Sequence, residues 1–364
     1  MSTAGVVAVR LALGVAADGG GSVGYGRGPN FPGWSDTTIY PDQPFAEDIP
    51  QLPTRDAADY GWSAGGGGTM WNNMSYETVE TPLGSKRVLK IRYPGATTNI
   101  TALDQVTPAH PLGNGELFGV GIRITGTWTG TLSFERSANG VDGWEAHTVL
   151  LASTESAFGT STTSNNVFWA RHSTDSFFRV RASSWTSGTA VVQVGQEGGS
   201  SPAKFSMGRL SGSPTRLYMR YLTRLPENLT LNGNTGMKML FFSQEQGNNH
   251  YINWGGESGV EPVVSTQGGN GNASTSNSIT TPLGEWADVE VELHTGTAGG
   301  NDGIARVWVN GQESAEKTDM PFFAAATTPR WTEINFDATY GGGRNPPPVN
   351  MFPQIAYVYM ESAA

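Results

Sequence analysis

Short segments of alternating apolar and polar residues recur along most of the chain, and most of them end at glycine, proline or asparagine. In Arg87–Tyr93, for example, Leu89 and Ile91 alternate with charged residues before the pattern stops at Pro94. This period of two predicts β-strands with one face in a core. Further strands are expected at 117–124, 129–135, 146–151, 177–182, 189–194, 216–225, 237–243, 249–254, 287–293, 304–310, 332–336 and 355–360. The chain is therefore predicted to be all-β, with antiparallel sheets.

The composition agrees with many short strands joined by turns. The 364 residues include 49 glycines and 21 prolines, and only 15% are charged, which disfavours long solvated helices. A net charge of −10 should repel nucleic acid and anionic membranes, so neither is an expected partner. Cysteine is absent, which excludes disulfides, thiolate metal sites and a cysteine nucleophile.

The second half of the chain carries a series of strand motifs in a fixed order. They are Leu217–Pro226, Gly236–Leu240, Glu285–Leu293, Asn301–Gly311, Ile334–Gly343 and Ala356–Met360. The series resembles the concanavalin A-like jelly roll, especially its bacterial polysaccharide-lyase branch. The earlier segment Val88–Pro94 is similar to the strand that directly precedes this series in that family. The resemblance implies a β-sandwich, but it does not imply one activity, because folds host many functions.

The residues between these two regions are expected to form an inserted module. Gly126–Gly140, followed by Trp144 and later by Phe177–Ala182, resembles small β-sandwich modules of tailed-phage structural proteins. The predicted organisation is an N-terminal strand and Gly-rich linker over 1–35, a jelly roll over 36–100 and 198–364, and an inserted antiparallel β-sandwich over 101–197. Residues 258–284, rich in Gly, Asn, Ser and Thr, are expected to form a long surface loop.

Two strands present side chains suited to binding sugars. The alternation along 216–225 groups three arginines and Tyr218 on one face, and one face of 303–311 offers a cation, an indole and an amide. The predicted glycan-binding residues are Arg220, Arg224, Arg306, Trp308 and Asn310. The alternative is that these faces are ordinary solvated surfaces or contacts between subunits.

The lyase resemblance implies a set of catalytic roles. Arg220 and Lys238 would neutralise a uronate carboxylate, His250 or Tyr251 would remove the C5 proton, and Tyr340 would protonate the leaving oxygen. Only Arg220 and Lys238 lie within matching motifs, so binding is expected ahead of catalysis.

Two other kinds of site are less well supported. Retaining hydrolysis is disfavoured, because the acids of 288–292 follow the pattern of a polar strand face. Asn301-Asp302-Gly303 could bind calcium through loop oxygens, although a type I′ hairpin turn uses the same residues. No other metal site and no other cofactor is expected.

These observations lead to three hypotheses about function. The first is a tailed-phage virion structural protein, either a capsid decoration, a head spike or a tail-associated protein, whose jelly roll binds host-surface glycans. Its partners would be other virion proteins and further copies of this chain, with the apolar segment Val6–Val15 as a contact, and its location would be the virion. The second is a polysaccharide lyase that cleaves uronate polymers by β-elimination. The third is a carbohydrate-binding protein without turnover.

Overall fold

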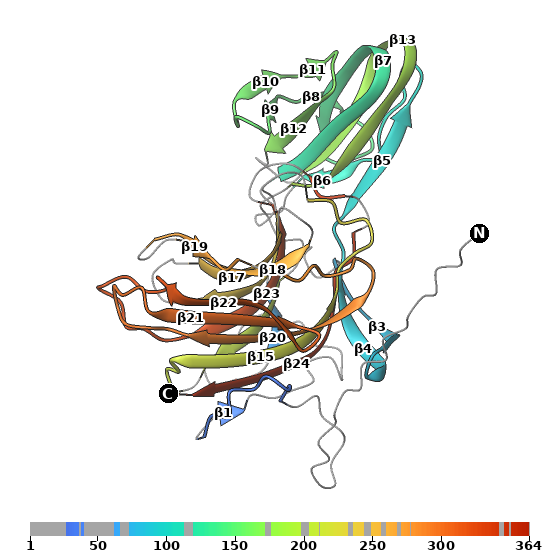
Figure 1. Ribbon diagram of the computed structural model, residues 1–364. Coiled ribbons are helices and arrows are strands. Elements are labelled where there is room, and N and C mark those ends of the chain that lie inside the picture. The colour runs from blue at the N-terminus through green and yellow to red at the C-terminus, as the bar shows by residue number, and fades with distance from the viewer. Residues whose placement is uncertain are drawn as a thin grey trace, which may run out of the picture.

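The protein is all-β, as its alternating pattern predicts. This computed structural model describes residues 27–35, 38–39, 62–65, 73–112, 119–171, 176–197, 204–210, 212–231, 236–243, 249–255, 260–267, 271–276, 278–341, 346–348 and 351–363. The described residues contain no helix that could cross a membrane. The segment Val6–Val15, predicted as an N-terminal strand, lies outside them. Figure 1 shows a larger body with stacked sheets and a smaller one at its end.

The first sheet of the larger body, here called sheet A, has eight antiparallel strands. Its order is β22-β21-β20-β15-β24-β4-β3, and β1 pairs with the other end of β24. The strands are β1 (Thr38–Ile39), β3 (Met74–Thr81), β4 (Gly84–Ile91), β15 (Arg216–Arg224), β20 (Trp286–His294), β21 (Gly303–Val309), β22 (Gln312–Met320) and β24 (Gln354–Ala363).

The second sheet, sheet B, has seven strands in the order β19-β18-β17-β16-β23-β14-β2. They are β2 (Trp62–Gly65), β14 (Lys204–Arg209), β16 (Met237–Ser243), β17 (Asn249–Gly255), β18 (Glu261–Gln267), β19 (Ala273–Ser274) and β23 (Glu333–Tyr340). Residues 258–284 were expected to be a surface loop, and this expectation is wrong. They include β18, because Val264 packs into the core and supplies the apolar contact of a strand.

Sheets A and B pack face to face around one apolar core, as in a jelly-roll sandwich. Sheet A contributes alternate residues such as Leu217, Met219 and Tyr221, and sheet B contributes residues such as Phe336 and Phe242. All of these side chains are buried. The side chains that matter for function are therefore those on the two outer faces.

The smaller body, here called the insert, is one nine-stranded antiparallel sheet folded over on itself. Its path is β10-β9-β12-β7-β13-β5, with β11 and β8 on β7 and β6 on β13. The strands are β5 (Gly95–Ile100), β6 (His110–Leu112), β7 (Gly119–Ser137), β8 (Glu145–Ala146), β9 (Val149–Leu151), β10 (Ala157–Gly159), β11 (Ser161–Thr162), β12 (Asn166–Arg171) and β13 (Ser176–Gln196).

Two long strands replace the four short ones that were expected in the insert. Residues 119–124 of the first predicted strand and all of 129–135 are parts of β7, and 177–182 and 189–194 are both parts of β13. Side chains from both halves of each strand, such as Ile122 and Phe134, belong to one core cluster. The sequence of the exposed middle of each strand predicts a turn, but β7 and β13 stay paired with each other along this part.

The insert begins at β5, because residues 95–100 pair with the end of β13 and not with the jelly roll. The chain enters at Gly95 and leaves at Gly195, and these two residues pair directly. Hydrogen bonds join the two bodies: Arg123 and Gln193 donate to the carbonyls of Pro346 and Pro347, at 3.4 and 2.5 Å.

The paired middle of β7 and β13 requires glycine at position 188. Gly188 has a φ of +90°, and a Cβ there would lie 2.2 Å from the Thr127 carbonyl oxygen and 2.7 Å from the Trp128 Cα. Gly143 also has a positive φ, of +62°, but a Cβ there would have no atom within 4 Å.

We expect Gly188→Ala to destabilise the insert by about 3 kcal/mol, because the methyl group adds a backbone clash to the positive-φ strain. Gly143→Ala is the matched control and should cost about 1 kcal/mol, because it introduces only the strain. Urea unfolding followed by tryptophan fluorescence measures both, and equal losses would contradict the paired geometry at Gly188.

Candidate functional site

The outer face of sheet A carries the residues that were grouped on 216–225, but a segment of the same chain covers most of this face. Residues 27–34, here called the strap, lie across β15 and its neighbours. Phe31 makes an edge-to-face contact with Tyr218 at 5.1 Å. Trp34 lies against His294 at 5.8 Å and beneath the Arg216 guanidinium at 5.3 Å. The prediction of a simple linker over residues 1–35 missed this packing.

The strap is held by hydrogen bonds to carboxylates as well as by its aromatic rings. Arg27 forms an ion pair with Glu361, with its Nε 2.9 Å from a carboxylate oxygen. Asn30 donates to both oxygens of Glu290, at 3.1 Å from its backbone nitrogen and 2.9 Å from its side-chain amide. Gly28 donates its backbone N–H to the Tyr218 hydroxyl at 3.0 Å.

These contacts satisfy a group of buried acids. Glu290, Glu292 and Glu361 are only 1%, 2% and 0% exposed. Burial pushes the pKa of Glu292 up, but hydrogen bonds from His294 and Arg306 outweigh burial, so its pKa is lowered and the group stays ionised. Burial, together with the charge of Glu290, raises the pKa of Tyr218 far above its usual value. The Tyr218 hydroxyl therefore stays protonated and donates to Glu290 at 2.6 Å.

The structure distributes the predicted glycan-binding residues over different environments. Arg220 is buried and grips Asp288 with two nitrogens, the closer at 2.6 Å, and Trp308 is also buried. Arg306 is paired with Glu292 and Glu316 at 3.0 and 2.8 Å. Asn310, with a φ of 51°, forms the tight turn between β21 and β22. Arg224 lines a pocket.

The residues with implied lyase roles fall on opposite faces of sheet B, apart from Arg220 in sheet A. Lys238 and Tyr251 lie on the outer face, whereas His250 and Tyr340 point into the core. Tyr340 donates its hydroxyl proton to the carbonyl of Thr230. The structure therefore does not bring His250 or Tyr340 together with Lys238.

The His250 ring is surrounded by aromatic side chains inside the sandwich. Its ring lies 5.1 Å from Phe322, 5.7 Å from Phe323 and 5.7 Å from Trp331. Neither ring nitrogen has a hydrogen-bond partner among the described residues. Burial lowers the pKa of His250 to about 4, so the ring is neutral at physiological pH.

The outer face of sheet B brings together a cation, two aromatic rings and polar groups, of which Tyr251 and Asn335 are buried and Lys238, Phe241 and Asp337 are half-buried. We call Lys238, Phe241, Tyr251, Asn335 and Asp337 the platform. The Lys238 ammonium lies 4.5 Å from the centre of the Tyr251 ring, and the Phe241 and Tyr251 rings meet at 5.5 Å with a 44° tilt. Phe241 is paired across the sheet with Tyr251 on one side and Asn335 on the other.

Burial tunes the titratable groups of the platform. It lowers the pKa of Lys238, against an opposing effect of the Asp337 charge, and so favours the neutral amine. It raises the pKa of Tyr251, partly offset by a hydrogen bond with Ser265. The lowered pKa makes the Lys238 ammonium easier to deprotonate, and the raised pKa keeps the Tyr251 hydroxyl protonated. Asn335 and Asp337 were missed as site residues, although their spacing on β23 already put both on one strand face.

The Asn301-Asp302-Gly303 segment uses its carboxylate internally. Thr297 donates its backbone N–H and its hydroxyl to Asp302, at 2.7 and 3.0 Å, and β21 begins at Gly303. The eight residues between β20 and β21 also exceed a type I′ turn. Within the described ranges, three or more His, Asp or Glu side chains never group as a metal site would require. Calcium binding here stays a prediction, and no chemical step is derived from it.

No protein-family model and no curated protein matches this chain. Solved structures resemble less than half of it. A Chlorella virus alginate lyase, vAL-1, is 12% identical over 47% of this chain and 78% of its own, with a TM-score of 0.36. Domain 4 of AbnA, an arabinanase from Geobacillus stearothermophilus in complex with arabinotriose, is 15% identical over 44% and 68%, with a TM-score of 0.32. The carbohydrate recognition domain of Emp46p is 8% identical over 44% and 78%, with a TM-score of 0.28.

We expect acid to destabilise the protein through His250. In the unfolded chain, His250 binds a proton below about pH 6.5, whereas in the folded protein it does so only near pH 4. The free energy of unfolding therefore falls as the pH drops from about 6.5 to about 4. The full shift is equivalent to about 3 kcal/mol. His250→Phe should raise stability at neutral pH by about 1–3 kcal/mol, because it removes an unpaired buried polar ring.

Urea unfolding at about pH 4.5, 5.5 and 7.5 measures this effect. The variant should lose less stability between these pH values than the wild type does. An identical loss in both proteins would show that other groups cause the acid sensitivity.

Proposed function

We propose that this protein binds a polysaccharide through the platform on the outer face of sheet B. The proposal rests on the half-buried Lys238 and Phe241, with the Lys238 ammonium held over the ring of Tyr251, which is itself only 5% exposed. Aromatic rings offer apolar surface to the C–H faces of a sugar, and amide, hydroxyl and charged groups pair with its hydroxyls. The corresponding face of sheet A is less suitable, because the strap already occupies it.

The charges favour a neutral polysaccharide over a uronate polymer. The platform holds one carboxylate, Asp337, for its one cation, Lys238, and Glu333 lies on the same face of β23. The whole chain carries a net charge of −10. A polyanion would gain little attraction from such a surface.

A second candidate function, β-elimination, is favoured by the lowered pKa of Lys238. In this reaction the neutral Lys238 amine would take the proton at C5 of a uronate, and the electron pair would form the C4–C5 double bond. The bond from C4 to the glycosidic oxygen would break, and Tyr251 would donate its proton to that oxygen. This assignment replaces the roles first given to His250 and Tyr340 by residues that share one face.

Calorimetric titration with neutral and uronate polysaccharides tests the binding proposal. Tyr251→Ala should weaken binding about tenfold or more, because an aromatic contact contributes about 1.5 kcal/mol. Phe158→Ala, which removes a partly exposed ring from the insert, is the control and should bind like the wild type. Absence of binding by the wild type, or unchanged binding by Tyr251→Ala, would contradict the proposal.

Ultraviolet absorbance of the unsaturated product separates binding from elimination. Tyr251→Phe keeps the ring but loses the proton donor, so it should retain binding and lose any turnover. Turnover in the wild type that disappears in Tyr251→Phe and in Lys238→Gln would favour the lyase.

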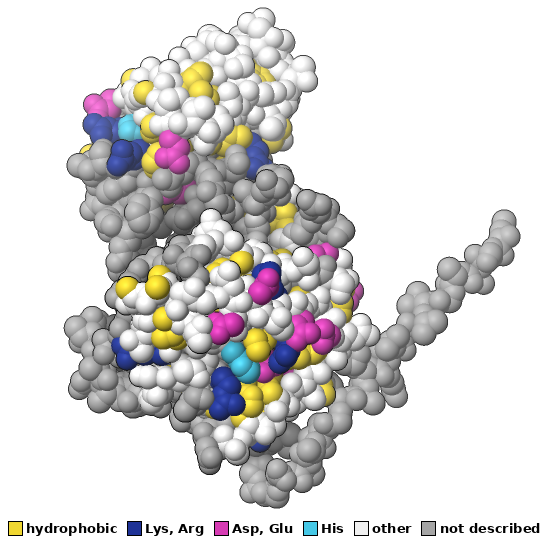
Figure 2. Space-filling model, turned by 60° about the vertical axis from the view of Figure 1, so that its left-hand side comes forward, with side chains coloured by type: hydrophobic (Ala, Val, Ile, Leu, Met, Phe, Trp, Pro, Cys, Tyr) yellow, Lys and Arg dark blue, Asp and Glu magenta, His cyan; other side chains and the backbone are white. Residues whose placement is uncertain are grey.

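The virion context stays part of the proposal, with the insert as the module that contacts a protein partner. Among the described residues, the exposed large apolar side chains are Leu103, Val106, Val141 and Phe158, and all four belong to the insert. Figure 2 shows apolar and charged side chains on both bodies. Mass spectrometry of purified phage particles tests this context. Absence of the chain from particles made by cells that contain it would contradict it.

A further inference from the structure

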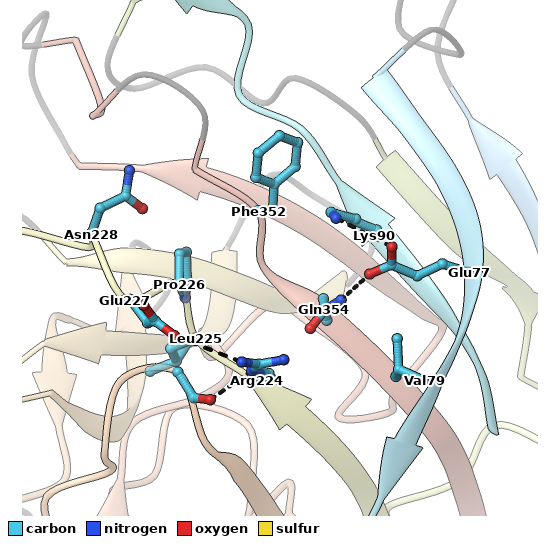
Figure 3. A pocket seen from close by; sticks show the side chains of 11 residues that line it. Glu77, Val79, Lys90, Arg224, Leu225, Pro226, Glu227, Asn228, Phe352 and Gln354 are labelled. Carbon is cyan, nitrogen blue, oxygen red and sulfur yellow. Dashed lines mark hydrogen bonds and ion pairs between the residues drawn. The ribbon is translucent and has the colours of Figure 1, made fainter. Parts of the chain in front are cut away.

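A pocket opens where the strap no longer covers sheet A. Arg224 at the end of β15 and Lys90 on β4 both pair with Gln354 of β24, so the three residues form one row across three strands. Gln354 therefore lies between two cations on the floor of the pocket (Figure 3). The pocket is an open depression with a volume of about 380 Å³, within the range of small-ligand sites.

One side of the pocket is a fixed hydrogen-bonded group. Lys90 lies 3.3 Å from one carboxylate oxygen of Glu77, and the Gln354 amide donates to the other. The Lys90 ammonium also lies 4.6 Å from the centre of the Phe352 ring. These contacts hold donors and acceptors in place before any ligand arrives, which lowers the entropic cost of binding.

The other side presents the guanidinium of Arg224. Its Nε donates to the carbonyl of Gly284 at 2.6 Å, which orients the group, and the Glu227 carboxylate is 3.8 Å from its Nη2. Glu227 is 81% exposed, so it is free to move with solvent. The remaining guanidinium N–H groups lie at the edge of the pocket.

Apolar groups complete the walls. Val79, Pro226 and Phe352 line the pocket between its charged residues, and Leu225 beside them is buried in the core. An apolar wall beside fixed donors and acceptors is the arrangement that a sugar ring requires, because a ring has C–H faces and hydroxyl edges.

We infer that this pocket binds one neutral sugar unit, at a site separate from the platform. Its two cations, Lys90 and Arg224, are matched by two carboxylates, Glu77 and Glu227. An anionic or cationic ligand therefore gains no net attraction. A sugar hydroxyl, by contrast, can accept a hydrogen bond from Arg224 and donate one to Glu227. Other hydroxyls can accept or donate at the Lys90–Glu77–Gln354 group.

The test uses the full chain carrying Tyr251→Ala, so that binding at the platform is weakened. Saturation-transfer NMR and calorimetry are applied with glucose, galactose, mannose and N-acetylglucosamine, and with glucuronate and galacturonate as the charged counterparts. At least one neutral sugar should bind saturably, and its affinity should change less than about twofold between low and high salt.

Arg224→Gln should weaken that binding about tenfold or more, because it removes a charged donor. Arg224→Lys keeps the charge but not the planar pair of donors, so it should also weaken binding. Arg87→Gln is the control, because Arg87 lies outside the pocket on the β3–β4 hairpin that also carries Lys90. Thermal unfolding of each variant checks that the fold is kept.

Three outcomes would overturn the inference: no binding of any neutral sugar, tighter and salt-sensitive binding of the uronates, or full binding by a folded Arg224→Gln variant. Because Tyr251→Ala is present throughout, failure here leaves the platform proposal untouched. If the platform binds no polysaccharide, the Arg224 variants still test sugar binding in this pocket.

Discussion

The buried carboxylates on the outer face of sheet A impose the constraint on which the rest of the surface depends. An ionised acid removed from water must be paired and hydrogen-bonded, or it costs several kcal/mol. Arg27 and Asn30 of the strap supply partners to Glu361 and Glu290, whereas Glu292 is paired with His294 and Arg306 of its own sheet. The strap and these two acids therefore stabilise each other, and the part of the face beneath the strap is covered.

Closure of that face determines where chemistry can occur. On β15 the strap contacts Arg216, Tyr218 and Arg220, and Arg224 lies beyond it at the pocket. On the other sheet, the platform is built around a lysine and a tyrosine whose pKa values move in opposite directions through the same cause, burial. One sandwich thus holds two polar sites on its opposite outer faces, with an apolar core between them.

The sequence was informative where a local period decides the outcome. Alternation on 216–225 correctly separated Tyr218 and Arg220 from the core residues Leu217 and Met219. The same rule separates His250 from Tyr251, because neighbouring strand residues point to opposite faces. Alternation along 249–254 is therefore enough to show that these two side chains cannot serve one site together.

The strap could not be predicted in this way. Residues 18–35 are rich in glycine and have no period, and the partners of Arg27 and Asn30 lie 334 and 260 positions away. Burial of Glu290 could not be predicted either, because the alternation along its strand predicts a solvated polar face. Long-range pairing of polar groups, unlike alternation, leaves no signal in a single sequence.

The adjacent ends of the insert have a consequence for how such a chain could evolve. Because Gly95 and Gly195 are paired neighbours, the gap that a deletion must bridge is only the width of one β-ladder, about 5 Å. A short turn could close it, and the entropic cost of a longer loop grows only logarithmically with length. A genome could therefore acquire, exchange or discard the module in one recombination event while the host sandwich kept every strand of its core.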